Sequence, residues 1–301
     1  MSGSLLLLFV FLSAFLAPPL SRLLRMPVPV GELVIGLLLG HFLAQGVALP
    51  EILGFLADFG FLLLMFLAGL EVDFNLLRQL ERRHFVFYAL YVVGMFLGAG
   101  LLAGLLGVGL AQALILALVS IGLMVATLRD MGILGRAFAK RVLILGVLGE
   151  VASLFGLTAM EKAAHYQGLL SLLKEVGIIA LFFLLLFLAF RLAGLFLWWY
   201  PEVGRRLVYE EDPSAMGIRL SLALMFAAAV MSGLVGLESV LGAFLAGMIL
   251  SYFLQKKHDL EAKLSAMGYG FLIPIFFIRT GMGIEFDRHA GRHRAGLMHR
   301  A

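Results

Sequence analysis

The chain has 301 residues, of which 62% are hydrophobic and 14% are charged, and its mean hydropathy is +1.04. This composition excludes a soluble globular domain and indicates a protein that lies in a lipid bilayer. The sequence has no cysteine, which excludes a disulfide framework, a thiolate nucleophile and a Cys-ligated metal. The chain has a net charge of +4. Lys and Arg gather in the cytoplasmic loops of membrane proteins, which explains this charge, so we expect no nucleic-acid partner.

Ten apolar segments follow one another along the chain, and most are close to the length of about 20 residues that a helix needs to cross a bilayer. They lie at about 4–20, 28–44, 51–70, 84–106, 111–128, 142–160, 174–199, 217–235, 237–254 and 267–284. The first follows "MSGS", which lacks the cations of a secretory signal, so we interpret it as a retained span. The sequence therefore predicts an all-α polytopic membrane protein with about ten transmembrane helices over residues 1–286. We expect the tail at 287–301 to be disordered.

Lys and Arg residues divide unequally between the two sets of alternate loops. Two of them, Lys162 and Lys174, lie on one side of the predicted membrane, and fifteen lie on the other. The fifteen are Arg22, Arg25, Arg78, Arg82, Arg83, Arg129, Arg136, Lys140, Arg141, Arg205, Arg206, Arg219, Lys256, Lys257 and Lys263. By the positive-inside rule the richer side faces the cytoplasm, which leaves the N-terminus outside. The tail at 287–301 breaks this pattern, because it is basic but follows the tenth segment on the outer side.

One carboxylic acid, Glu150, lies in the middle of the otherwise apolar run "VLILGVLGEVASLFGL" at 142–157. An ionised carboxylate at a helix centre costs about 3 kcal/mol on insertion scales, so intramembrane acids usually face a wet cavity or a partner and mark ion pathways. Ser153 lies one helical turn further on, where its hydroxyl can reach the same ion. We interpret Glu150 as a site for a cation and a proton. The alternative is a permanently protonated structural acid, with Ser153 as an ordinary packing hydroxyl.

Other charged side chains lie inside the predicted spans or near their ends. Arg279 lies within the tenth segment and needs an anion, and we expect a structural pair for which Glu238 is a candidate partner. A pair with Glu150 would instead hold that acid ionised and oppose proton exchange. Glu32 and Glu238 lie near the entrances of spans, where capping or snorkelling toward the membrane surface is the simpler interpretation.

Two parts of the sequence resemble each other. "GELVIGLLLG" at 31–40 matches "LESVLGAFLA" at 237–246 without a gap, and "AGLEVDF" at 68–74 matches "TGMGIEF" at 280–286. The matched pairs are Glu32/Glu238, Val34/Val240, Gly36/Gly242, Leu39/Leu245, Gly69/Gly281, Val72/Ile284, Asp73/Glu285 and Phe74/Phe286. The second copy follows the first by seven spans, and an odd shift inverts it in the membrane, which is a signature of secondary transporters. We expect a first repeat at about 28–160 and a partial second repeat at about 237–286, which three further helices after residue 301 would complete.

Four motifs resemble the monovalent cation:proton antiporter-2 family, the bacterial sodium/proton and potassium/proton exchangers. They are "VPVGELVIGLLLG" at 28–40, "FGFLLLMFLAGLEVDF" at 59–74, "LGAFLAGMIL" at 241–250 and "FLIPIFFIRTGMGIEF" at 271–286. The resemblance implies an inverted-repeat fold with a dimerisation domain and a core domain, in which two discontinuous helices cross. The first discontinuous helix would be the segment at 111–128, and the second would lie beyond residue 301.

The resemblance also implies that a cation and a proton compete for one carboxylate on the span after the first discontinuous helix. That position is Glu150 here. Ser120 matches the serine of a Thr-Ser pair in the discontinuous helix, so Ser120 and Ser153 are expected to help bind the ion together with freed backbone carbonyls. Gly149 departs from the family, which has a polar or acidic residue there, and Glu150 replaces the usual Asp.

The implied function is the exchange of Na⁺ or K⁺ for protons by alternating access, carried out by a homodimer in a bacterial inner membrane. The sequence has no glycine-rich phosphate loop, nucleophile constellation or nucleotide-binding domain. We therefore expect no enzymatic activity, no cofactor and no metal beyond the transported cation. Two other interpretations stay open. One is a truncated or non-transporting chain, or a subunit that needs a partner chain to complete its core. The other is an inverted-repeat symporter that binds an organic anion at half-helix N-termini, which uptake that requires Arg279 would favour.

Overall fold

The computed structural model describes most of the chain in separate stretches. These are residues 3–42, 49–72, 82–109, 120–134, 141–146, 148–150, 215–235, 237–253 and 258–284, together with isolated residues between 112 and 199. The predicted tail at 287–301 and most of the predicted seventh span at 174–199 lie outside the described residues.

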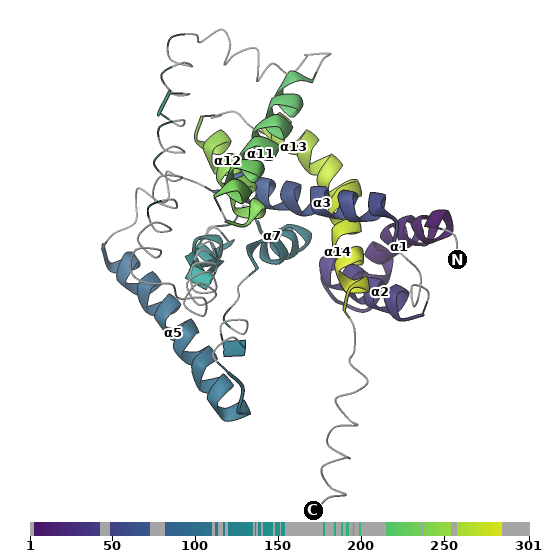
Figure 1. Ribbon diagram of the computed structural model, residues 1–301, viewed down its shortest axis with the longest axis horizontal. Coiled ribbons are helices and arrows are strands. Elements are labelled where there is room, and N and C mark those ends of the chain that lie inside the picture. The colour runs from purple at the N-terminus through teal and green to yellow at the C-terminus, as the bar shows by residue number, and fades with distance from the viewer. Residues whose placement is uncertain are drawn as a thin grey trace, which may run out of the picture. The chain divides into compact units, whose positions relative to one another are not determined.

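Every regular element in the described stretches is a helix, as the sequence predicts (Figure 1). The elements are α1 (Gly3–Leu23), α2 (Val28–Phe42), α3 (Glu51–Leu70), α5 (Arg82–Leu106), α7 (Ile121–Asp130), α11 (Met216–Leu234), α12 (Ser239–Phe253), α13 (His258–Met267), the π-helix η1 (Gly268–Leu272) and α14 (Ile273–Met282).

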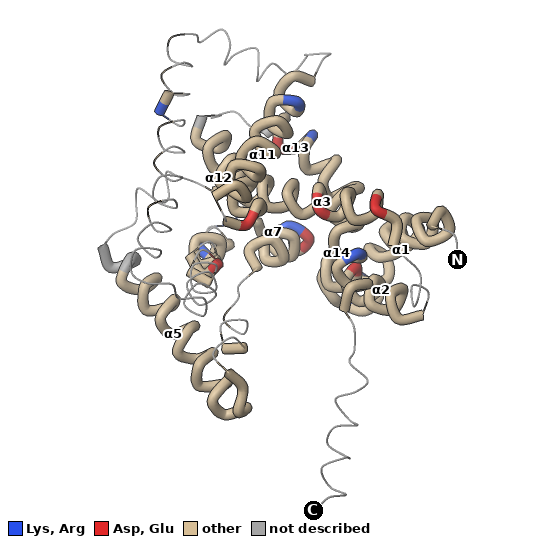
Figure 2. Tube along the Cα trace, in the orientation of Figure 1, with Lys and Arg blue, Asp and Glu red and all other residues tan. Residues whose placement is uncertain are grey.

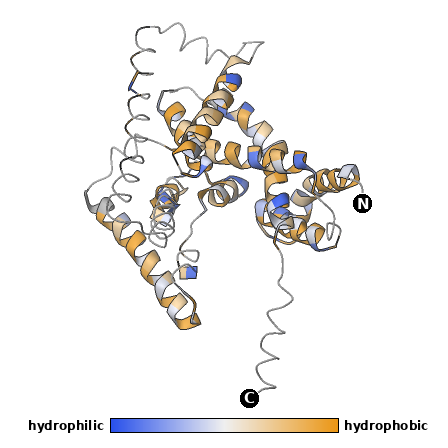
Figure 3. Cartoon of the chain, in the orientation of Figure 1, coloured by the Kyte–Doolittle hydropathy of each residue, from blue (hydrophilic) through white to orange (hydrophobic). Residues whose placement is uncertain are grey.

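Five helical stretches are long and apolar enough to cross a membrane, and hydrophobic residues colour most of the helical ribbon in Figure 3. They are Gly3–Leu23, Glu51–Leu70, Val86–Leu106, Met216–Leu234 and Leu260–Met282. Two shorter apolar helices, Val28–Phe42 and Ser239–Tyr252, complete the set. These helices match seven of the predicted segments, five plus two, and support a multi-pass helical membrane protein. The total of ten spans stays a prediction.

The tenth predicted segment begins earlier in the structure than in the sequence analysis. The prediction starts at 267, whereas α13, η1 and α14 follow one another without interruption from His258 to Met282. The first of these helices has the sequence "HDLEAKLSAM", which is too polar to be recognised as part of an apolar span. The π-helix continues the helical backbone across the junction, so the polar turns and the apolar turns are consecutive parts of one uninterrupted helical stretch.

The chain divides into two compact units. The first, here called the α2–α14 unit, consists of Met1–Gly60 and Tyr269–Ala301, and the second, the α7–α12 unit, consists of Phe61–Gly268. In the α2–α14 unit, α2 packs along α14 and α1 contacts both helices. Its core consists of Leu6, Val10, Leu53, Ala57, Ile275, Ile278 and Met282.

Two glycines bring the backbones of α2 and α14 into contact. A Cβ atom at Gly36 would overlap the carbonyl oxygen of Ile278, and a Cβ atom at Gly281 would overlap the carbonyl oxygen of Leu33. Small residues allow this close approach between helices in membranes, where van der Waals packing replaces the hydrophobic effect as the main attraction.

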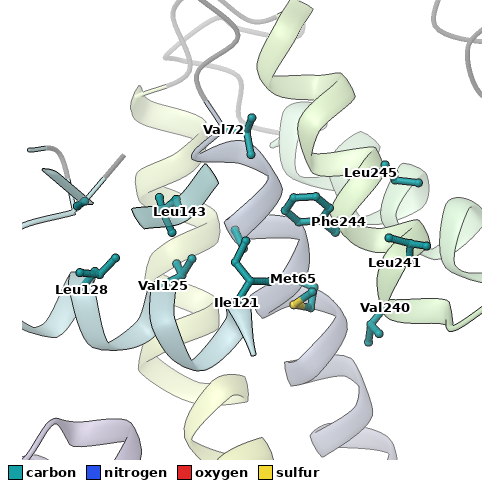
Figure 4. Packing of buried hydrophobic residues seen from close by; sticks show 12 residues of the cluster. Met65, Val72, Ile121, Val125, Leu128, Leu143, Val240, Leu241, Phe244 and Leu245 are labelled. Carbon is teal, nitrogen blue, oxygen red and sulfur yellow. The ribbon is translucent and has the colours of Figure 1, made fainter. Parts of the chain in front are cut away.

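The α7–α12 unit contains a second crossing of the same kind. A Cβ atom at Gly69 in α3 would overlap the carbonyl oxygen of Phe244, and one at Gly247 in α12 would overlap that of Phe66. The core around this crossing joins α3, α7 and α12 (Figure 4). It consists of Met65, Ala68, Val72, Ile121, Val125, Leu128, Ala139, Leu143, Val240, Leu241, Phe244 and Leu245.

The two crossings share one contact pattern. In each, a glycine lies over the carbonyl oxygen of the residue three positions before the glycine of the other helix, as 281 − 3 = 278 and 247 − 3 = 244 show. Gly247 therefore has the role of Gly36, whereas the sequence comparison pairs Gly36 with Gly242. Gly242 instead faces the preceding helix α11, where a Cβ atom would overlap the carbonyl oxygen of Ala228. The repeat itself, and the pairing of Gly36 with Gly242, stay predictions.

Candidate functional site

The helix α7 begins in the middle of the predicted segment 111–128. Helical hydrogen bonds run from the amides of Ala113 and Ala117 to the carbonyls of Gly109 and Ala113, each at 3.1 Å. Ser120 then has an extended backbone with φ −102 and ψ 102, and α7 starts at the next residue. The Ser120 hydroxyl oxygen accepts a hydrogen bond from the amide of Leu123 at 3.4 Å and caps the helix.

The other end of α7 is closed by a glycine turn. Gly132 has a φ of +67, which glycine adopts without strain. Its amide donates to the carbonyl of Arg129 at 2.9 Å, and the amide of Ile133 donates to that of Leu128 at 3.1 Å. This is the Schellman arrangement that ends helices. Sequence signals at both ends thus confine α7 to ten residues.

Glu150 lies against the N-terminus of α7. Its Oε2 atom accepts a hydrogen bond from the backbone amide of Ile121 at 3.0 Å. The first amides of a helix have no partner within the helix, and the helix dipole places partial positive charge there. The N-terminus of α7 therefore stabilises a negative charge on the Glu150 side chain, which the surrounding apolar residues do not.

Ser153 connects the Glu150 helix to the chain just before the break. Its side chain is 1% exposed, and its hydroxyl lies 2.9 Å from the carbonyl oxygen of Ala117 and 2.7 Å from that of Gly149. A hydroxyl has one proton, so it donates to one of these carbonyls at a time. Ser153 and Glu150 thus hold the residues on both sides of Ser120.

The structure brings the three predicted site residues to one short stretch of backbone, 117–121. A carboxylate, two hydroxyls and the carbonyl of Ala117 supply the oxygen atoms that hard cations prefer. Sequence reasoning did not identify the amide of Ile121 or the carbonyl of Ala117, because backbone groups leave no residue-type signal. The nearest signal is Ser120, whose side chain is a favoured helix cap.

Charged side chains are sparse along the described helices (Figure 2). The Nε atom of Arg279 is buried and has no hydrogen-bond partner among the described residues. Arg279 belongs to the α2–α14 unit, whereas Glu150 and Glu238 belong to the α7–α12 unit, so its pairing with either acid stays a prediction. Glu32 differs from the expectation of a snorkelling side chain, because it is only 4% exposed within α2.

Removing the Ser153 hydroxyl is expected to destabilise the protein. Ser153→Ala leaves the buried carbonyl of Ala117 without its partner, which should lower the free energy of unfolding by about 1–3 kcal/mol. Ser221→Ala is the matched control, because Ser221 is also 1% exposed but donates within its own helix to Gly217 at 2.7 Å. Thermal unfolding in detergent should show a clearly larger loss for Ser153→Ala. Equal losses would mean that the bond between the segments contributes nothing.

Comparison with known proteins defines the class to which this arrangement belongs. Residues 11–296 match the family described as "Sodium/hydrogen exchanger, transmembrane". The match covers nearly the whole chain, and the chain belongs to this family. The resemblance that the sequence motifs indicated is therefore confirmed.

Individual relatives carry names of the same kind. The chain is 28% identical to "Putative Na(+)/H(+) antiporter YjbQ" of Bacillus subtilis, over 93% of this chain and 47% of the relative. It is 29% identical to "Probable Na(+)/H(+) antiporter GerT" of Bacillus cereus, over 93% and 74%. It is 28% identical to "Na(+)/H(+)-K(+) antiporter GerN" of the same organism, over 92% and 70%. The chain thus spans about half the length of the first relative and nearly three quarters of the other two.

Proposed function

We propose that this chain exchanges a monovalent cation, Na⁺ or K⁺, for protons across a membrane by alternating access. The observation that carries the proposal is the contact between the Glu150 carboxylate and the amide of Ile121 at the start of α7. The names of the relatives support cation and proton as the exchanged ions, and that of GerN includes both Na⁺ and K⁺. Glu150 is the carrier acid in this proposal.

The chemistry of exchange needs one group that binds either ion and releases it again. When ionised, Glu150 offers a negative charge to a cation, with Ile121 orienting one of its oxygens. When protonated, it is neutral and has no electrostatic hold on the cation, so the two ions compete. Ser120, Ser153 and the carbonyls beside them supply further oxygen ligands. Exposure of this group to each side in turn converts competition into exchange.

The reciprocal glycine crossings support the inverted repeat that this mechanism uses. Gly247 − Gly36 and Gly242 − Gly31 both give an offset of 211, and Gly281 − Gly69 gives 212. Gly31 lies against the side chain of Ser21 in the preceding helix α1, and Gly242 lies against the backbone carbonyl of Ala228 in the preceding helix α11. Segment 111–128 is then the discontinuous helix of the first repeat, and the break lies at Ser120.

Reconstitution of the purified chain into liposomes that contain a pH-sensitive dye tests the function. Addition of Na⁺ or K⁺ outside acidified liposomes is expected to drive protons out and raise the internal pH. Protein-free liposomes and addition of choline, which is too large for an oxygen-lined site, are the controls. A response no larger than that of protein-free liposomes to both Na⁺ and K⁺ would overturn the proposal.

The proposed orientation places the N-terminus outside in a bacterial inner membrane. Because the sequence has no cysteine, each introduced thiol is the only one in the chain. Val108 follows α5 and Arg136 follows α7, and both side chains are exposed. We expect Val108→Cys to react with a membrane-impermeant maleimide in spheroplasts and Arg136→Cys to react only after permeabilisation. The reverse pattern would show that the topology is inverted.

The family resemblance supports a homodimer. Cross-linking of the reconstituted chain at increasing lipid-to-protein ratios is expected to give a dimer whose yield stays constant on dilution. A yield that falls in proportion to dilution would indicate monomers that collide.

A further inference from the structure

Glu150 lacks the second polar or acidic group that its neighbour in sequence could supply. Gly149 precedes it. In the described residues, the Glu150 side chain accepts a hydrogen bond from the amide of Ile121 and interacts electrostatically with one acid, Glu238. The exchange mechanism above does not use Glu238. Because Glu238 lies on another helix, far along the chain, its position relative to Glu150 is a property of the fold.

The start of α12 and the start of α7 contribute residues to one buried cluster. Ile121, the first residue of α7, belongs to the same buried cluster as Val240 and Leu241 in the first turn of α12 (Figure 4). Leu237, which directly precedes Glu238, packs against the same cluster. Residues on either side of Glu238 thus belong to or pack against the same cluster as the helix end that binds Glu150.

Glu238 itself is not a member of this cluster. Its side chain is exposed, while its backbone carbonyl accepts a hydrogen bond from the Ser232 hydroxyl at 2.9 Å. This bond holds the turn between α11 and α12 in place. Negative charges on the carboxylates of Glu238 and Glu150 repel each other.

Other charged groups on the surrounding elements lie further along them. Arg129 and Asp130 close the opposite end of α7, Glu71 follows the last residue of α3, and Arg141 precedes Glu150 by nine residues, 150 − 141 = 9. Arg129 and Asp130 lie at least two helical turns from Ile121, and Arg141 lies at least two turns from Glu150. Glu71 lies closer to its neighbours in the site, because it follows Gly69, where α3 crosses α12. The packing of the start of α12 in the same cluster as Ile121 places Glu238 to act on Glu150.

We propose that Glu238 is a positioning residue that acts through Glu150: its fixed negative charge strengthens the binding of any cation, including a proton, at the Glu150 carboxylate. The inference rests on the function proposed above. A cation and a proton each bring one positive charge to Glu150, so the field of Glu238 favours both by a similar factor. Because the factors cancel when the two ions compete, the effect of removing Glu238 depends on pH.

The test measures cation-driven proton flux for wild type and Glu238→Gln over a range of cation concentrations. At alkaline pH, where Glu150 is ionised, the KM for the cation is expected to rise about two- to five-fold, the size of an exposed charge interaction. At acidic pH, where protons compete, the KM should change little, since binding of the competing proton weakens equally. The maximal rate should stay within about two-fold of wild type, because Glu238 neither binds nor releases the transported proton.

Three controls separate charge from structure. Glu238→Asp keeps the charge and should retain the wild-type KM. Glu51→Gln removes an exposed acid from the first turn of α3 and should also leave the KM unchanged. High concentrations of choline chloride should shrink the difference between wild type and Glu238→Gln, because salt screens exposed charges.

Each outcome decides the inference. An unchanged KM for Glu238→Gln at alkaline pH, or equal changes for Gln and Asp, would overturn the role of Glu238 and leave the proposed exchange intact. If wild type itself gives no flux, the proposed function fails and this inference fails with it. A pH-dependent rise in KM that Asp does not share would establish it.

Discussion

Glu150→Gln is expected to reduce cation-driven proton flux to the level of protein-free liposomes. Gln has nearly the same shape, and its side-chain oxygen can still accept the hydrogen bond from the amide of Ile121. It cannot carry a negative charge or exchange a proton, so it removes the competition between the two ions and leaves the packing intact. The dye-loaded liposomes described above give the measurement.

Two controls accompany this prediction: the unfolding temperature of Glu150→Gln, and transport by a variant that lacks a different acid. Glu150→Gln should unfold at nearly the wild-type temperature, and Glu51→Gln, in the first turn of α3, should transport normally. Glu150→Asp keeps the charge but is one methylene shorter, so it should retain reduced flux. Exchange by Glu150→Gln at the wild-type rate would show that this carboxylate is a structural acid.

Gly69→Ala is expected to have the largest effect on stability outside the site. The added methyl group would overlap the carbonyl oxygen of Phe244 and approach the amide of Met248, both of which are backbone atoms that cannot rotate away. The helices α3 and α12 must then separate, at a cost of about 1–3 kcal/mol. Thermal unfolding and the yield of folded protein in detergent measure this loss.

Gly54→Ala is the matched control on the same helix. No atom lies within 4 Å of a Cβ at Gly54, so the substitution meets open space and gains up to about 1 kcal/mol of helix propensity. Gly69→Ala combined with Gly247→Ala should cost less than the sum of the single changes, because one separation of the helices relieves both overlaps. Equal stability of the Gly69 and Gly54 variants would contradict the backbone contact.

The sequence predicted the helices well where apolar runs are unbroken. α3 has the predicted bounds, and α1, α2, α5, α11 and α12 differ from the prediction by a few residues at one or both ends. The sequence did not reveal that the polar helix α13 begins the last helical stretch, because hydropathy measures how apolar a segment is and not whether its helix continues. Glu150 was predicted as a site residue because it is the one acid in the otherwise apolar run at 142–157.

Contacts that involve the backbone could not be predicted from the sequence. The partner of Glu150 is the amide of Ile121 and one carbonyl near Ser153 is that of Ala117, and neither residue type signals its role. The repeat stays a prediction from matched residues, and the sequence does not show which glycines lie over a carbonyl of a crossing helix. Gly242 and Gly247 are equally good matches to Gly36 by residue type, and only their contacts distinguish them.

Calorimetry of cation binding to the purified chain measures whether a cation and a proton compete for Glu150. The heat of Na⁺ or K⁺ binding is measured at one pH in two buffers that differ in ionisation enthalpy. We expect the heat to differ between the buffers for wild type, because binding displaces a proton into the buffer, and we expect no such difference for Glu150→Gln. Cation binding with equal heats in both buffers, or undiminished proton release by Glu150→Gln, would show that the two ions do not compete for this carboxylate.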